Sequence, residues 1–397
     1  MESCALMHGE RHVATVHEDG SCTVYDPGYM PYNLQLEETD ASGDPIVRKL
    51  NLDRFYYWCA TRPLTLERAS AGDFLRSQGL EGAATDRERA EIVLCCHGLN
   101  LTDAFWLRAP GETESFAQCN LFEHPRAREC VDVVLRDRGM IAKNTGLILG
   151  SDPSGLFSRQ SAAPNLWLFR DGGYELLKGS SPREAAAELL ASRIARRFEV
   201  DQVLYEPMDY QGRHVTRSSL VTTKEKSIVS AGDMKFFLVR TGQSLWELIR
   251  SHDEYGYHMM NIIDYLVGNT DRHVRNWGFW VRNGDHTPGK LFPLMDFNRS
   301  FLSYDTLEGG KCFPNGGKMS QKDAAVRGVQ TIGLKQIGRL PDNLPALFSE
   351  LNSLDGSRLD LMFRARLDVL RQAAREKLGA ACEKEAMSDL ERKGSER

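Results

Sequence analysis

The side chains best suited to chemistry lie in residues 269–276 and at one carboxylate that follows them. Asp271 and Asn276 are five residues apart, which is the separation between the catalytic base and the metal-binding asparagine in the catalytic loop of protein kinases. Asp296 directly follows the apolar run 291–295, which predicts a strand that would hold its carboxylate at a fixed point. Phosphoryl transfer needs such a set, because one carboxylate orients a hydroxyl while hard oxygen atoms bind Mg²⁺.

A purely structural role is the alternative for the same residues. Asp271 and Asn276 would then cap the loop that follows an apolar helix, and Asp296 would begin a turn with Asn298. The spacing of Asp271 and Asn276 alone matches many sequences by chance. The catalytic interpretation is favoured because a strand-borne carboxylate follows that spacing.

A cation for the phosphates of a nucleotide is available in Lys178, at the end of the strand-like run 174–177. Ser181, followed by a proline and then by Glu184, predicts the start of a helix with a capping box. Because Glu184 would be occupied in that box, Glu188 is the expected partner of Lys178, as in the Lys–Glu pair of kinases. The alternative is that Lys178 is a solvated strand-end charge and Glu188 an exposed helix residue.

Two glycine-rich segments could lie near a nucleotide. Segment 150–160 contains Ser154 and Gly155, and its small residues would let backbone N–H groups approach the phosphates. It matches neither the G-x-G-x-x-G nor the Walker A pattern, so a plain turn is the alternative. Segment 309–318 also fails the Walker A pattern, and its place after Asp296 is typical of a mobile activation segment.

Short strands and later helices are expected to position these side chains. Helices return from Leu245 onward, after a series of strand-like runs at 147–150, 166–169, 174–178, 215–220 and 227–229. We therefore expect an α+β fold for this part of the chain.

The first 140 residues contain no convincing catalytic set and are expected to form an accessory module. Residues 12–16 and 21–25 flank a Glu-Asp-Gly turn and predict a hairpin, whereas residues 51–140 look mostly helical. Four consecutive aromatic residues, 55–58, cannot all be buried on one face of a helix or strand. Some are therefore expected to pack against another surface, either the domain that begins near residue 141 or, as the alternative, a partner protein.

Composition and charge exclude several classes of protein. The 397 residues suffice for two or three domains, and no run of roughly 18 apolar residues could span a membrane. The amino end lacks a basic region followed by an apolar core, so we expect no secretory signal and a cytoplasmic location. The net charge is −5 without a basic stripe, so no direct nucleic-acid binding is expected. Nine cysteines, none spaced Cys-x-x-Cys, indicate neither a disulfide framework nor a zinc site.

The motifs at 269–276 and 293–298 together resemble the active site of HipA-like kinases, the bacterial toxin kinases. They are more distantly similar to phosphatidylinositol kinases, whose loop also reads Asp-Arg-His. The resemblance covers about residues 141–380 and implies an α+β, two-lobed protein-kinase-like fold with an added N-terminal module. We therefore expect an accessory module at 1–140, a β-rich N-lobe with a helix over 182–199 at 141–240, a helical C-lobe at 241–382 and, from its charged composition, a flexible tail at 383–397.

The resemblance also implies roles for individual residues. Asp271 becomes the catalytic base and His273 a neighbour that contacts phosphate. Asn276 and Asp296 become the Mg²⁺ ligands, and Lys178 becomes the lysine that contacts the phosphates of ATP.

Two further features follow from the same resemblance. Asn298 stands where protein kinases have the glycine of Asp-Phe-Gly, which leaves the metal-binding aspartate in place. In HipA-like kinases a serine of the phosphate loop is autophosphorylated, and Ser151, Ser154 and Ser158 are all candidates for that role.

The function expected from the resemblance is transfer of the ATP γ-phosphate to a Ser or Thr hydroxyl on a protein substrate, with Mg²⁺. It also implies the toxin of a toxin–antitoxin pair, with a small DNA-binding antitoxin as partner. The same active site would serve a small-molecule or lipid-headgroup kinase, which is one alternative. A nucleotide-binding pseudokinase that acts as an interaction module is the other.

Overall fold

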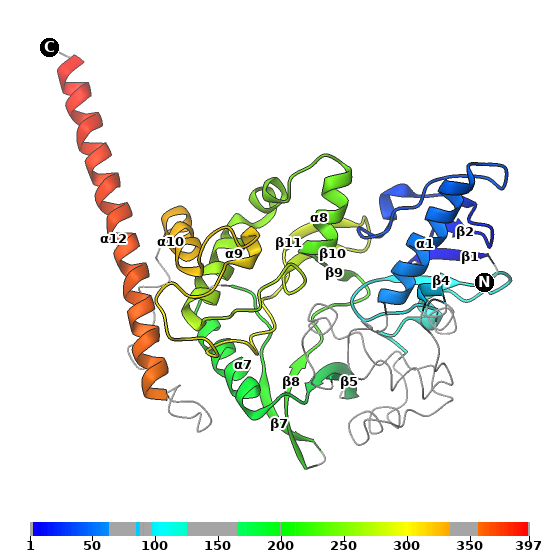
Figure 1. The fold of residues 1–397 in the computed structure, drawn as a ribbon, viewed down its shortest axis with the longest axis horizontal. Helices are drawn as coiled ribbons and strands as arrows, with labels where there is room; N and C mark the ends of the chain where they lie inside the picture. The colour runs from blue at the N-terminus through cyan, green and yellow to red at the C-terminus, as the bar shows by residue number, and fades with distance from the viewer. Residues whose placement is uncertain are drawn as a thin grey trace. The chain divides into compact units, whose positions relative to one another are not determined.

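The structure is a computed structural model, and it describes residues 3–62, 85–87, 90, 97–124, 165–170, 172–198, 200–210, 212–333 and 356–395. The chain divides into two compact units, each built from several segments (Figure 1). The first unit is Met1–Ser181, Tyr205–His252 and Val274–Phe292, and the second is Pro182–Leu204, Asp253–His273 and Pro293–Arg397. No helix in the described ranges is long and apolar enough to cross a membrane.

The first unit begins with a four-stranded antiparallel sheet in the order β3-β2-β1-β4. Its strands are β1 (Cys4–His8), β2 (Arg11–Val16), β3 (Cys22–Val24) and β4 (Phe105–Arg108). The hairpin predicted over residues 12–25 is confirmed, since Val16 pairs with Cys22. Its turn requires glycine at position 20, where φ is +84° and a Cβ atom would lie 2.1 Å from the carbonyl oxygen of Arg48.

Helix α1 (Pro45–Thr61) packs on this sheet and carries the aromatic run 55–58 (Figure 1). Asp44 caps the helix, because its side chain accepts a hydrogen bond from the backbone N–H of Ile46. The aromatic residues Phe55, Tyr56 and Trp58 are buried in a core shared with residues of the sheet, whereas Tyr57 is 54% exposed.

The expectation that aromatic residues of the run 55–58 must pack outside the module is therefore wrong. The core around Phe55 and Trp58 includes Leu6 and Val13 from the strands and Leu34 from the loop that follows them. Because the helix contacts protein on more than one side, three of its four consecutive aromatic residues are buried within the module itself. The mostly helical character expected for 51–140 holds for α1, but the other described elements of that range are strand β4 and the short helix α4 (Phe116–Cys119).

Beyond this module, the first unit contains a three-stranded antiparallel sheet in the order β11-β10-β9. Its strands are β9 (Lys226–Ser230), β10 (Gly278–Arg282) and β11 (Thr287–Leu291), and α8 (Ala231–Arg240) follows β9 directly.

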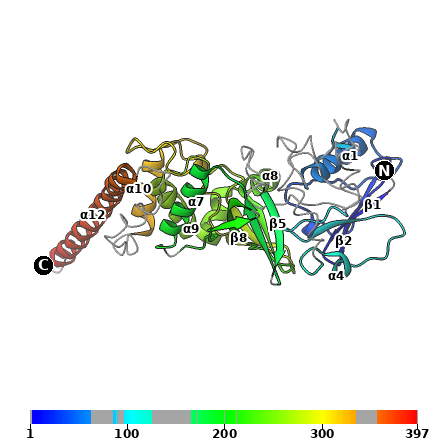
Figure 2. The same ribbon diagram turned by 90° about the horizontal axis from the view of Figure 1, so that it is seen from below.

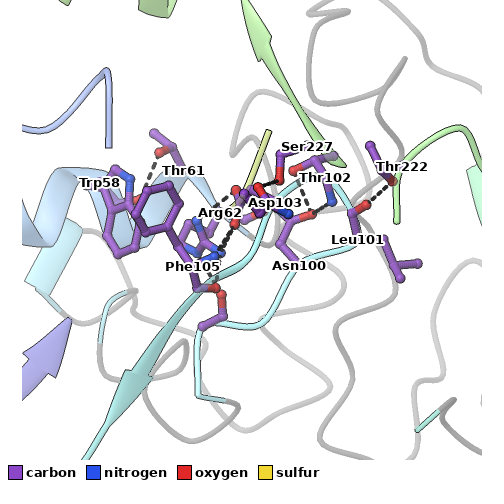
Figure 3. Close-up of polar contacts among 12 residues, drawn as sticks. Trp58, Thr61, Arg62, Asn100, Leu101, Thr102, Asp103, Phe105, Thr222 and Ser227 are labelled. Atoms are coloured by element: carbon purple, nitrogen blue, oxygen red, sulfur yellow. Dashed lines mark hydrogen bonds and ion pairs between the residues drawn. The ribbon is translucent and has the colours of Figure 1, made fainter. Parts of the chain in front are cut away.

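The N-terminal module binds to this sheet through hydrogen bonds (Figure 3). The carbonyl oxygen of Thr102 accepts from the backbone N–H of Ile228 at 3.0 Å, and the hydroxyl of Thr222 donates to the carbonyl of Leu101. At another point the hydroxyl of Tyr32 donates to the carbonyl oxygen of His286 at 2.6 Å. The module therefore satisfies a backbone donor of β9 at the edge of the sheet, where unpaired groups are otherwise exposed.

A buried arginine fixes the segment that makes these contacts. Arg62, at the end of α1, forms a two-pronged ion pair with Asp103, at 2.9 and 3.1 Å (Figure 3). Its remaining N–H groups donate to the carbonyl oxygens of Gly98 and Phe105, and its guanidinium lies over the ring of Trp58. The guanidinium is thus satisfied by hydrogen bonds, as a buried charge requires.

A second four-stranded antiparallel sheet of the first unit has the order β5-β6-β8-β7. Its strands are β5 (Asn165–Arg170), β6 (Gly173–Lys178), β7 (Glu206–Tyr210) and β8 (Arg213–Ser219). The strands predicted at 166–169, 174–178 and 215–220 are therefore confirmed. The expected strand at 147–150 lies outside the described residues.

The second unit is helical. It contains α7 (Pro182–Ala195), most of α9 (Leu245–Val267), α10 (Gln321–Ile332) and α12 (Gly356–Ser395), and α10 lies beside α12 in both views (Figures 1 and 2). The start of α7 at Pro182 confirms the predicted helix start. Helix α9 is kinked at Asp253, where the backbone leaves helical φ and ψ values.

The carboxyl-terminal helix extends into the range for which a flexible tail is expected. Helix α12 continues to Ser395, within the range 383–397, and the flexibility of that range stays a prediction. Its Glu, Lys, Arg, Ala and Leu residues all have high intrinsic helix propensity, which favours a helix even where the sequence is highly charged.

Candidate active site

The loop that carries Asp271 begins where α9 ends, in the second unit. Gly268 permits this exit, because its φ is +63° and a Cβ atom there would lie 2.5 Å from the ring of Tyr304. Asn269 then folds the loop: its amide donates to Asp264 at 3.1 Å, and its side-chain oxygen accepts from the backbone N–H of Asp271 at 3.2 Å. The side chain of Asn269 therefore fixes the loop, because it binds α9 through Asp264 and the backbone of the loop at Asp271.

Arg272 is the residue that ties this loop to the rest of the second unit. It is buried and forms a two-pronged ion pair with Asp264 of α9, at 2.9 and 3.1 Å. Its third contact is a hydrogen bond to the carbonyl oxygen of Met295 at 2.5 Å. The same side chain thus joins α9, the loop of Asp271 and the segment that carries Asp296.

The expected strand before Asp296 is only partly present. Strand β11 ends at Leu291, and Leu294 instead forms an isolated parallel bridge with Gln202. Two hydrogen bonds of 2.9 Å hold Leu294 to the chain at residues 201–203. Asp296 follows this bridge in the left-handed region, with φ +58°, a conformation that aspartate tolerates and that is often found at functional sites.

Asp296 is close enough to Asp271 to influence the pKa of that carboxyl. The pKa of Asp271 is raised from its usual 3.8 to about 6, first by burial and second by the negative charge of Asp296, while Arg299 and Arg272 act in the opposite direction. A carboxylate with a pKa near neutrality is suited to accept a proton from a hydroxyl group. His273 lies beside it, with Nε2 4.0 Å from a carboxylate oxygen of Asp271.

Asn276 belongs to the first unit and is fully buried just before β10. The residues on both sides of it are held by the amino end of α8. The backbone N–H of Gly232 donates to the carbonyl oxygen of Val274 at 2.9 Å, and that of Ala231 donates to Trp277 at 2.8 Å.

Lys178 and Glu188 are both buried, which contradicts the alternative of two solvated charges. Lys178 is the last residue of β6 in the first unit, with its ammonium group 5.1 Å from the ring centre of Tyr205. Glu188 lies on α7 in the second unit. Glu184, expected in the capping box, has a carboxylate oxygen 3.9 Å from Arg299.

The remaining sequence candidates fall into two groups. Ser154 and Gly155, together with the other serines of segment 150–160, lie outside the described residues. Segment 309–318 contains a short 3-10 helix, Phe313–Asn315, and precedes α10. The sequence analysis missed Asp264 and Arg272. The signal that could have pointed to Asp264 is that it is an acidic residue in the mostly apolar segment 255–267.

The chemistry of the donors fits Mg²⁺. Asn276 and Asp296 offer an amide and a carboxylate oxygen, and Mg²⁺ is commonly held by one or two protein oxygens together with substrate phosphates rather than by a protein cage. The described residues contain no group of three or more His, Cys, Asp or Glu side chains that could hold a metal ion.

The fold that carries these side chains is a HipA-like kinase fold, of the α+β class expected from the sequence. The structure is similar to HipA from Shewanella oneidensis MR-1, solved as a toxin–antitoxin complex with HipB and operator DNA. The TM-score is 0.52 at 12% sequence identity, and the match covers 95% of this chain and 97% of that one. It is also similar to the Helicobacter pylori proinflammatory kinase CtkA, with a TM-score of 0.46 at 14% identity over 55% of this chain and 92% of that one. No protein-family model and no curated protein matches the sequence.

Proposed function

We propose that the protein transfers the γ-phosphate of ATP to a Ser or Thr hydroxyl of a protein substrate, with Mg²⁺ as cofactor. The observation that carries this proposal is the pair Asp271 and Asp296: a largely buried carboxylate, 15% exposed, with a pKa of about 6 beside a second carboxylate, in a HipA-like kinase fold.

Asp271 is the catalytic base of the proposed reaction. Its carboxylate accepts the proton of the acceptor hydroxyl as that oxygen attacks the γ-phosphate, which removes the positive charge that would develop on the oxygen. Arg272 positions this carboxylate through its contacts with Asp264 and Met295. His273, next to Asp271, contacts phosphate in the proposal.

Lys178, Asn276 and Asp296 bind the nucleotide and its metal in the proposal. Asn276 and Asp296 would ligate Mg²⁺, which when bound neutralises charge on the phosphate oxygens. Lys178 contacts the phosphates of ATP as a point charge, and Glu188 orients the ammonium group of Lys178. Ser154 and Gly155 are proposed to contact the same phosphates through backbone N–H groups.

Incubation of the purified protein with γ-labelled ATP and Mg²⁺, alone and with a host lysate, tests the proposal. Mass spectrometry should find phosphoserine or phosphothreonine on a protein, and labelling should disappear with EDTA and with Asp271→Asn. Labelled lipid or metabolite in place of protein would move the proposal to the small-molecule or lipid-headgroup kinase. Nucleotide binding without any labelled product would indicate a pseudokinase.

We further propose that the protein acts in the cytoplasm as the toxin of a toxin–antitoxin pair, with a small DNA-binding antitoxin as partner. The similarity to HipA, which was solved with HipB and operator DNA, supports this proposal. Co-expression with a small DNA-binding protein encoded beside this chain should give a complex that survives gel filtration and should relieve growth inhibition.

A further inference from the structure

A small polar pocket lies in the second unit next to the loop of Asp271. Helix α9, that loop and the segment before α10 all contribute to its walls. Its polar lining is Asn261, Asp264, Asn269, Arg272, Lys311 and Gln321.

Direct contacts fix the position of this pocket relative to Asp271. The side chain of Gln321 donates to the carbonyl oxygen of Asn269 at 2.5 Å and accepts from the backbone N–H of Gly310 at 2.9 Å. A Cβ atom on Gly310 would lie 3.5 Å from the methyl group of Thr270. The segment that carries Lys311 therefore packs on the two residues that precede the proposed base.

Residues 311–318, which we name the lysine turn, place two cations near each other. The backbone N–H of Cys312 donates to Met319 at 3.0 Å, and that of Gly317 donates to Cys312 at 2.9 Å. Lys311 forms an antiparallel bridge with Ser320, and a Cβ atom on Gly317 would lie 3.8 Å from the Lys311 side chain. Lys311 thus lies beside the residue that precedes Lys318, and both lysines are exposed.

The charges around the pocket leave these two cations unbalanced. Asp264 is neutralised by its ion pair with Arg272, and burial raises the pKa of the Cys312 thiol to about 11, so the thiol is neutral. Lys322 pairs with Glu308. Within the described part of the chain neither Lys311 nor Lys318 forms an ion pair.

We propose that the pocket and the lysine turn bind an acidic side chain of the acceptor protein, close to the hydroxyl that Asp271 deprotonates. The inference rests on the proposed kinase function and names the class of acceptor: a Ser or Thr flanked by Asp, Glu or a residue that is already phosphorylated. Lys311 lines the pocket and contacts the anion at its mouth. Lys318 attracts the same anion from the outer side of the turn.

An anionic membrane surface fits this arrangement less well than a peptide does. Membrane binding through charge uses clusters of several lysines or arginines, each of which contributes on the order of 1 kcal/mol. The lysine turn offers two cations held next to a pocket by hydrogen bonds, which suits recognition of one side chain.

The test uses the full chain and a library of peptides with one Ser acceptor and Asp, Ala or Lys at each flanking position. The wild-type protein should favour Asp at one or two positions, mainly through KM, because the contact is the same in ground and transition states. Lys311→Glu with Lys318→Glu should raise KM for the Asp peptide about tenfold and invert the preference towards Lys. Lys311→Arg should keep the preference for Asp. Lys311→Glu alone has a matched control in Lys290→Glu, at an exposed lysine on β11, because each of these single variants makes the same change in net charge.

The outcomes distinguish failure of the proposed acceptor-binding role from failure of the proposed kinase function. Peptide phosphorylation without a charge preference, or an equal effect of Lys290→Glu, would overturn the role of the lysine turn while the kinase function stands. The role of the lysine turn would also be overturned by a second result. In that result the protein would label anionic vesicles more than phosphatidylcholine vesicles in a way that depends on Lys311, while substitution of Lys311 leaves peptide phosphorylation unchanged. Absence of any transfer, including autophosphorylation, would instead refute the proposed function.

Discussion

Partial burial of Asp271 is the feature on which the proposed chemistry depends at the scale of single residues. Its charged form is disfavoured in the folded protein, because its pKa is about 6 there against an ordinary value of 3.8. At a pH above about 6 the charge of Asp271 therefore opposes folding, whereas at a pH below 3.8 the carboxyl is neutral in both states and does not. If Asp271 is the base, as proposed, it is maintained at a cost to stability, which is a common relation between active sites and their scaffolds.

We therefore predict that Asp271→Asn removes activity and stabilises the fold. Transfer should fall by at least about a hundredfold, whereas ATP binding should persist because the base acts on the acceptor. At pH 7.5 the free energy of unfolding should rise by about 1–3 kcal/mol, since a buried charge is removed without a change in shape. Denaturant titration and nucleotide titration measure the two effects. Wild-type turnover in the variant would show that Asp271 is not the base.

The pH profile of the wild-type enzyme follows from the same carboxylate. Because Asp271 must be deprotonated to accept a proton, kcat/KM should rise with pH and then level off. Burial, the first cause of the raised pKa, persists when Mg²⁺ is bound, whereas Mg²⁺ on Asp296 would offset the second cause, so the midpoint should lie between the ordinary 3.8 and about 6. A profile in which kcat/KM falls as the pH rises through this range would contradict the assignment.

Arg272 and Asp264 form a buried pair whose members depend on each other. Arg272→Met leaves the Asp264 carboxylate buried without its partner and should cost about 3–5 kcal/mol. The double variant Asp264→Leu/Arg272→Met should lose less than either single variant, because no buried charge remains. Urea unfolding of the three variants measures the coupling. Losses that simply add would show that the ion pair carries no coupling energy.

Lys178 and Glu188 offer a second test of pairing, now through activity. Lys178→Ala should weaken ATP binding or slow transfer, and Glu188→Ala should do so more mildly. If the two residues act as a unit, the double variant should lose less than the sum of the single effects. Strict additivity would direct attention to Glu184 as the alternative partner.

At the scale of elements, the sequence predicted what depends on local pattern. The strands at 174–178 and 215–220 and the start of α7 were predicted correctly, because alternation and capping residues act within a few positions. The segment 291–295 was read as a strand from its apolar run, yet Leu294 finds its partner at Gln202. Such a partner, distant in sequence, has no local signal.

The candidate site shows the same limit. The spacing of Asp271 and Asn276 is a property of the sequence itself and could be found there. The contact of Arg272 with Met295 joins residues 23 positions apart, and the contact with Asp264 requires knowledge of how the loop turns after α9. Sequence spacing therefore identified reactive groups but not the arginine that positions them.

The N-terminal module meets the sheet of β9, β10 and β11 at two buried histidines. The rings of His8 on β1 and His286 between β10 and β11 are 5.1 Å apart, centre to centre. Burial lowers the pKa of each to about 4. For His8 the next cause is the proximity of His286, and the charge of Asp103 acts in the opposite direction.

This junction should make stability depend on mildly acidic pH. A histidine with a folded pKa of about 4 and an ordinary pKa of 6.5 does not affect the free energy of unfolding above pH 6.5, where it is neutral in both states. As the pH falls from 6.5 towards 4 it lowers that free energy, because the unfolded chain binds the proton more tightly. The loss should reach about 3 kcal/mol per histidine. His286→Asn, which tolerates the positive φ of 52° at this position, should flatten the dependence when melting is followed between pH 4 and 7. An unchanged slope would contradict the role of this histidine.

At the scale of the whole molecule, the question is whether the N-terminal module can be separated from the rest of the first unit. Its contacts are distributed: Thr102 with Ile228, Leu101 with Thr222, and Tyr32 with His286. A further ion pair joins Glu123 to Lys224, and the hydroxyl of Tyr174 donates to the carbonyl oxygen of Leu121 at 2.7 Å. The module thus covers parts of both sheets that follow it within the first unit.

We therefore predict that a chain beginning at Met140 is unstable or poorly soluble. Removal of residues 1–139 exposes the edge of β9, which carries unpaired backbone groups, and uncovers the rings of His286 and Phe237, both of which pack on Tyr32. Expression, gel filtration and thermal melting of the shortened and full-length chains measure the difference. The matched control is Tyr57→Ser, which changes an exposed side chain of α1 and should leave solubility and melting unchanged. A stable, active monomer from the shortened chain would show that the module folds and acts independently, and its exposed Tyr57 face would then be the place to look for a partner protein.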